Sequence, residues 1–181
     1  FQGHAECVEA VLDGWGEESG AQALRWAVAR AAVCGHAHVL RHLRERGYSL
    51  CTPNDTDELT PLAYAARFGQ PTAAAALCED PDVARALQEN REDNAILCAG
   101  DRCHSSVLRV LLETARQEGT THSWDADGFE VCPLVVCATS DDIASMEILL
   151  EYDYPVHRHA SSNINPLCIA ATRGARGMVE L

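Results

Sequence analysis

The strongest constraint on the fold is a short segment that recurs along the chain at nearly constant spacing. The segment TPLAYAARFGQ (60–70) aligns with WAVARAAVCGH (26–36), NAILCAGDRCH (94–104), CPLVVCATSDD (132–142) and NPLCIAATRGA (165–175), and FQGH (1–4) resembles the tail of a further copy. The turn position of the copies falls at Gly3, Gly35, Gly69, Cys103, Asp141 and Gly174, at intervals of 32, 34, 34, 38 and 33 residues. A period near 33 residues predicts a repeat array, in which each unit packs only against its neighbours.

Each copy predicts two short helices joined by a tight turn. In the copy at 60–70, the Thr60 hydroxyl can cap the first helix, and Pro61 suits the first helical position. Gly69 ends that helix, and a second one is predicted from Thr72 to about Cys78. Helices this short are marginal in water, so the units must gain stability by stacking.

These segments resemble the ankyrin repeat family. The family repeat has a β-hairpin finger, then Thr-Pro-Leu-His and two small residues that open an inner helix, then Gly-His and an outer helix. The matching residues are Thr60, Pro61, Leu62, Ala65, Ala66 and Gly69, then Pro166, Leu167, Ala170, Ala171 and Gly174, with Gly35-His36 and Gly3-His4 at the turns. The third full copy departs from the pattern, with Asn94-Ala95-Ile96 in place of Thr-Pro-Leu and Cys103 in place of the turn glycine.

The resemblance covers essentially the whole chain and implies an all-α ankyrin-repeat solenoid, with helix–turn–helix pairs linked by β-hairpin-like fingers. The expected single array, truncated at both ends, divides into repeats at about 1–20 (partial), 21–53, 54–87, 88–124, 125–157 and 158–181 (partial). Tetratricopeptide repeats have a similar period. However, proline opens the first helix of three copies, and acidic polar segments separate the pairs, which favours ankyrin.

Composition narrows the class of protein. With 47% hydrophobic residues among 181, the chain can build a core that grows by stacking, and we expect neither a signal peptide nor direct membrane insertion. The nine cysteines lack the paired spacing of a zinc site. Five of them occupy positions where the repeat needs small apolar residues: Cys34, Cys78, Cys98, Cys137 and Cys168. We therefore expect no metal and no cofactor, and a reducing compartment, either cytoplasmic or nuclear.

The histidines are interpreted as structural residues. His4 and His36 follow turn glycines and are predicted to hydrogen-bond the backbone of the next turn. His157 and His159 could share a metal through their spacing on a strand, but they are better explained as ordinary finger residues.

The only candidate for nucleophilic chemistry is Cys103-His104-Ser105. The repeat register places these residues on the turn between two helices, where adjacent side chains point apart. The sequence has no glycine-rich phosphate loop, no G-x-S-x-G and no H-E-x-x-H. We therefore expect a chain that is not an enzyme.

By resemblance, ankyrin arrays bind partners with their finger tips and the exposed, concave face of the inner helices. The tips NDTDEL (54–59), QENRED (88–93) and DADGFE (125–130) carry charges of −3, −2 and −3, and RHASSN (158–163) carries +1. Together they account for about half of the formal net charge of −13. This favours a Lys/Arg-rich peptide or protein as the partner and disfavours nucleic acid, because no basic stripe is present.

The expected contact residues lie on the fingers and at the ends of the inner helices. They are Asp55, Asp57, Glu58, Leu59, Arg67, Phe68, Arg91, Asp93, Asp101, Arg102, Trp124, Asp125, Asp127, Phe129, Val131, Thr139, Ser140, Ile164, Thr172 and Arg173. Trp124 lies in the longest interval, in a surplus segment at 114–129, and either anchors a partner or covers the divergent third copy.

The leading hypothesis is a monomeric, non-catalytic array that recognises a segment of another protein. The alternative is a structural array that makes intramolecular contacts within a larger channel, ubiquitin ligase or effector protein.

Overall fold

The structure, a computed structural model, describes residues 17–53, 59–87, 94–119, 133–154 and 166–179. Every regular element in these ranges is a helix, and none of them is a strand. The all-α class is therefore confirmed for this part of the chain. The predicted finger tips at 54–58, 88–93, 125–130 and 158–163, and the turn at Gly3, lie outside the described residues.

The helices fall into five pairs in the described ranges, each with an inner and an outer member. The inner helices are α2 (Glu17–Cys34), α4 (Pro61–Arg67), α7 (Ala95–Asp101), α9 (Pro133–Ser140) and α11 (Pro166–Arg173). The outer helices are α3 (Ala37–Glu45), α5 (Pro71–Cys78), α8 (Ser105–Gln117), α10 (Ile143–Glu151) and α12 (Arg176–Val179), and the short α6 (Pro81–Ala86) follows α5.

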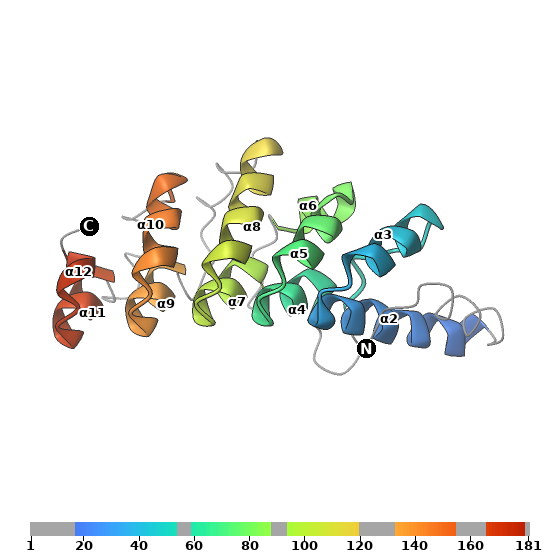
Figure 1. Cartoon of the computed structure of the whole chain (residues 1–181), viewed down its shortest axis with the longest axis horizontal. Coiled ribbons are helices and arrows are strands. Elements are labelled where there is room, and N and C mark those ends of the chain that lie inside the picture. The colour runs from blue at the N-terminus through green and yellow to red at the C-terminus, as the bar shows by residue number, and fades with distance from the viewer. Residues whose placement is uncertain (1–16, 54–58, 88–93, 120–132, 155–165, 180–181) are drawn as a thin grey trace.

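The pairs stand side by side in chain order, from α2 and α3 at one end to α11 and α12 at the other (Figure 1). Each inner helix contacts the next inner helix, and each outer helix contacts the next outer helix. The molecule is therefore a row of stacked units, as the repeat period predicts.

One hydrophobic core runs through the row. The outer helices contribute fully buried leucines, such as Leu43 of α3, Leu77 of α5 and Leu108 of α8. The inner helices contribute large apolar residues such as Leu62 and Leu134, beside small residues that are completely buried. Small residues at these positions let neighbouring inner helices approach closely.

All the predicted turn positions within the described ranges adopt the left-handed backbone conformation. The φ angles are 75° at Gly35, 65° at Gly69, 58° at Cys103, 57° at Asp141 and 69° at Gly174. The next amide donates to a carbonyl five residues back in the same inner helix, for example from Gln70 N to Ala65 O at 2.9 Å. This is the Schellman arrangement, which satisfies the carbonyls left open at a helix C-terminus.

Helix caps explain where the inner helices begin. Thr60 Oγ1 accepts a hydrogen bond from Ala63 N at 3.2 Å, and Pro61 opens α4, as predicted. In the divergent third copy, Asn94 takes the same role and accepts from Ile96 N at 2.8 Å. The third copy therefore keeps a cap although it lacks Thr-Pro.

Two elements differ from the expectation. Helix α2 begins at Glu17, within the segment assigned to the partial first repeat, and runs for 18 residues. Helix α6 was not anticipated at all, although Asp80 caps it by accepting from Asp82 N at 3.0 Å and Pro81 opens it. In the described ranges, no helix has the length and apolar character needed to cross a lipid bilayer.

Candidate partner-binding face

The last two residues before each turn are exposed in four successive repeats. These residues are Arg67 and Phe68, Asp101 and Arg102, Thr139 and Ser140, and Thr172 and Arg173, and we call this set the inner-helix face. All eight were expected as contact residues, and the structure leaves all eight accessible to a partner.

Leu59 does not belong to this face. It was expected as a contact, but only 8% of its surface is exposed. Its apolar side chain is covered just before the cap of α4, where it contributes to the core. The other expected contacts lie outside the described residues: Asp55, Asp57, Glu58, Arg91, Asp93, Trp124, Asp125, Asp127, Phe129, Val131 and Ile164.

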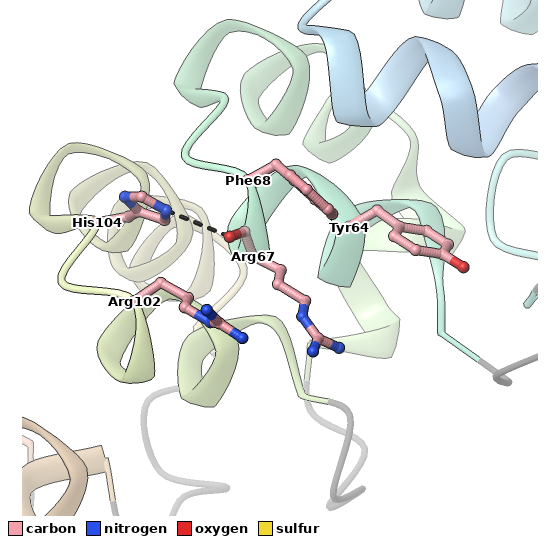
Figure 2. Close-up of a pocket in the computed structure, with 5 residues that line it drawn as sticks. All are labelled: Tyr64, Arg67, Phe68, Arg102 and His104. Atoms are coloured by element: carbon pink, nitrogen blue, oxygen red, sulfur yellow. Dashed lines mark hydrogen bonds between the residues drawn. The ribbon is translucent and has the colours of Figure 1, made fainter.

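A groove of about 740 Å³ opens where α4 and α7 end side by side (Figure 2). Arg67, Phe68 and Tyr64 line it from α4 and its cap, and Arg102 and His104 line it from the following repeat. Arg67 and Arg102 extend from the two helix ends in the same direction (Figure 2). Sequence reasoning identified three of these residues but not Tyr64 or His104.

His104 joins the two repeats beneath the groove. Its Nε2 lies 3.3 Å from the Arg67 carbonyl oxygen, and its ring covers Gly69, where an added Cβ would lie 2.7 Å from Cε1. This contact runs to the turn of the preceding repeat, while the backbone hydrogen bond expected of His36 stays a prediction. His104 therefore connects its own turn to the unit before it.

The charge on the described part of the face is basic rather than acidic. Its charged residues are three arginines and Asp101. Arg102 Nε lies 3.3 Å from Asp101 Oδ2, while Arg67 has no ion-pair partner among the residues that the structure describes. All 14 basic residues of the chain are arginines.

The aromatic component of the face is Phe68, whose surface is 50% exposed. The hydroxyls of Thr139 and Thr172 donate to carbonyls of their own helices, at 2.8 Å and 2.9 Å. The groups with most capacity to bind a partner are therefore Phe68 and the two arginines beside it.

Comparison with solved structures decides the fold family. The ankyrin repeat domain of human ASB11 matches with a TM-score of 0.63 at 18% sequence identity, over 84% of this chain and 67% of that chain. The chain has the ankyrin-repeat fold. The ankyrin repeat domain of Bcl-3, a unique member of the IkappaB protein family, matches over 84% of this chain and 82% of that chain, at 17% identity and a TM-score of 0.42. The fold assignment rests on the first match.

Comparisons of sequence alone do not extend this result. A scan against models of protein families finds no match. A search among curated proteins finds no relative at a significant level.

In this ankyrin array, Cys103 is poorly suited to act as a nucleophile. Partial burial and the neighbouring charge of Asp142 raise the pKa of its thiol, although Ser140 opposes the shift by a hydrogen bond. An activated cysteine needs the opposite shift. His104 lies on Gly69 and the Arg67 carbonyl, so it has a packing role at the turn.

The cysteines of the array are free thiols in all seven positions that the structure describes. Cys137 is completely buried, and burial raises the pKa of Cys78 to about 11 despite a hydrogen bond from Thr114. The packing interpretation is wrong for Cys34 and Cys168, which are exposed. Among the described residues, no three His, Cys, Asp or Glu side chains gather as a metal site would require.

The outer helices of the array use their charges to connect neighbouring repeats. Arg41 and Arg44 of α3 both lie 2.8 Å from the Glu79 carboxylate at the end of α5. Slight burial opposes ionisation of Glu79, but these two arginines outweigh it and lower its pKa. Arg109 pairs in the same way with Glu151 across α8 and α10, at 3.1 Å. In the described residues, no such ion pair spans the inner-helix face, whose one pair lies within a single repeat.

Proposed function

We propose that this ankyrin array is a non-catalytic module that binds a segment of another protein on its inner-helix face. The observation that carries the proposal is the groove between α4 and α7, where Phe68 is half exposed beside two arginines. Stacked repeats of this kind form extended binding surfaces. The face also differs from the outer surface, whose charges pair between repeats.

The free energies that these contacts can contribute indicate which residues matter most for affinity. Fully burying a phenylalanine side chain contributes about 1.5–3 kcal/mol, whereas an exposed ion pair contributes about 1 kcal/mol or less. Phe68 would therefore provide much of the affinity. The charged residues would mainly orient the partner and set the salt dependence of binding.

The charge of the partner follows from two separate surfaces. The acidic finger tips favour basic residues in the partner, and this prediction rests on sequence alone. The described part of the face carries three arginines and one aspartate, so it does not add to that preference. The expected reducing compartment, cytoplasmic or nuclear, also rests on the odd cysteine count.

One observation favours the alternative, a structural array with contacts inside a larger protein or assembly. Leu167 of α11 is 54% exposed, although the equivalent residues Leu62 and Leu134 are 4% and 1% exposed. An apolar surface at the last described repeat suits a packing neighbour.

Partner capture with matched variants tests the proposal. The first variant changes two residues of the inner-helix face by Phe68→Ala and Arg67→Ser, and the second changes Asp55, Asp57, Asp125 and Asp127 to Lys. The control is Arg85→Ser, because Arg85 of α6 is also exposed but lies away from the inner-helix face and pairs with Asp82 of its own helix. Captured proteins lost in the first variant and kept in the control would support the proposed face.

If captured proteins are lost in the second variant alone, the binding site lies on the finger tips instead. Capture that is identical for all four proteins would contradict a binding role for either surface. The structural alternative would then be preferred.

A further inference from the structure

We infer that the groove between α4 and α7 binds an acidic side chain, Asp or Glu, of the partner segment, with an adjacent apolar or aromatic residue packed on Phe68. This inference rests on the proposed function and specifies its ligand chemistry. It concerns the groove residues Tyr64, Arg67, Phe68, Arg102 and His104.

The two arginines of the groove are the first feature that favours an acidic side chain. They come from adjacent repeats, and both extend to the same side of the helix ends (Figure 2). In the described part of the chain, Arg67 has no ion-pair partner, and Arg102 pairs through its Nε with Asp101 while its side chain stays 50% exposed. A guanidinium binds a carboxylate through two parallel hydrogen bonds, so this pair is suited to an acidic side chain.

The second feature is the apolar surface beside the two arginines, which favours an apolar or aromatic neighbour in the partner. Phe68 follows Tyr64 by one helical turn, and both line the groove. Half of the Phe68 surface remains exposed, enough to receive a neighbouring side chain of the same peptide. An acidic residue next to an apolar or aromatic one would therefore satisfy both parts of the groove.

The groove is also held in shape before any partner arrives. His104 contacts the Arg67 carbonyl oxygen at 3.3 Å and covers Gly69, so the two helix ends that carry the arginines are fixed to each other. A site formed in advance binds with a smaller entropic cost than one ordered by the ligand.

The local charge favours a carboxylate over a phosphate. Among the described residues, two guanidinium groups line the groove, Asp101 partly neutralises one of them, and the chain carries a formal charge of −13. A dianionic phosphate would meet more repulsion than a monoanionic carboxylate. A segment with an acidic residue in the groove and basic residues opposite the finger tips would match both surfaces.

Selection from a display library of random dodecapeptides on the whole chain tests the inference. We expect enriched peptides to share an Asp or Glu beside an aromatic or large apolar residue. Synthetic versions of one enriched peptide then provide the comparison, with its acidic residue kept, changed to the neutral amide, changed to Arg, or replaced by phosphoserine.

The neutral amide should weaken binding to the wild-type chain at least tenfold, and raising the salt concentration should weaken the acidic peptide more than the amide. The double variant Arg67→Ser and Arg102→Ser should bind the acidic and amide peptides equally, while Arg85→Ser should behave as wild type. Changing Arg67 to Glu should restore binding of the peptide that carries Arg.

Three results would overturn the inference in different ways. If binding requires Phe68 but is not weakened by the change to the amide, the groove does not bind an acidic side chain, and the proposed function still holds. Phosphoserine that binds more tightly than the carboxylate would assign the groove to a phosphorylated segment. If no peptide is enriched on the folded chain, the proposed function fails together with the inference.

Discussion

At the scale of single residues, the array depends on one backbone position per repeat that must turn left-handed. Gly69 shows why this position also governs stacking. Its φ is 65°, and an added Cβ would lie 2.7 Å from the His104 ring of the next repeat. Gly119 has a similar φ of 68°, but nothing lies within 4 Å of where its Cβ would be.

Substitutions at Gly69 and Gly119 separate the cost of backbone strain from the cost of losing the contact between repeats. Gly119→Ala should destabilise the array by about 1 kcal/mol through the left-handed conformation alone. Gly69→Ala should cost clearly more, because it also displaces His104. Urea melts of the two variants measure the difference, and His104→Ala in the Gly69→Ala background should recover part of it. Equal costs would mean that the His104 contact contributes nothing.

The thiol of Cys78 gives a prediction about pH. Burial raises its pKa to about 11, above the value near 9 expected for the unfolded chain, so its contribution to stability is present below pH 9 and is lost as pH rises toward 11. Between pH 8 and pH 10 the free energy of unfolding should fall by about 1 kcal/mol more in the wild type than in Cys78→Ala. Parallel pH profiles for the two proteins would contradict a buried thiol at this position.

At the scale of elements, the repeat register fixes which face of each inner helix is buried. Leu62 of α4 and Leu167 of α11 occupy the same register position, but they are 4% and 54% exposed. The contrast arises because α4 has an inner helix on either side, α2 and α7, while α11 contacts only α9 among the described inner helices.

Leucine deletions at these two sites test the register. Leu62→Ala should destabilise the array by about 2–5 kcal/mol because it leaves a cavity in the core. Leu167→Ala should cost far less, since most of its surface is already in water. Thermal or urea unfolding gives both values, and a neutral Leu62→Ala would show that the register is wrong.

Sequence reasoning succeeded at this scale where one residue type had a local backbone role. Thr60 as a cap and Gly69 as a turn depend only on the chain within a few residues, and both were predicted. Helix α6 was missed although Asp80 and Pro81 are strong start signals, because the repeat template assigns that segment to a linker. The groove could be identified only in part, since the approach of His104 to Gly69 depends on how adjacent repeats stack.

At the scale of the whole molecule, the third repeat should be the least stable interior unit. It lacks both the helix-opening proline and a glycine at the turn, where Cys103 holds φ at 58°, whereas the fourth repeat keeps Pro133 although Asp141 turns at 57°. Left-handed conformation costs a residue with a side chain about 1–2 kcal/mol. Opening in this repeat would separate the array into two parts, because each unit contacts only its neighbours.

Hydrogen exchange tests this ranking. Amides of α7 should exchange faster than those of α4, and Cys103→Gly should slow exchange in α7 and stabilise the array by about 1 kcal/mol. Exchange in α7 as slow as in α4 would show that the Asn94 cap and the buried core of this repeat offset the missing proline and glycine.

An NMR titration of the isotope-labelled array with an enriched dodecapeptide tests binding on the inner-helix face. We expect amide shifts concentrated at residues 64–70 and 98–104, around the groove, with the amides of the outer helices α3 and α10 unchanged. Shifts centred on the outer helices, with the groove amides unmoved, would contradict binding on the inner-helix face.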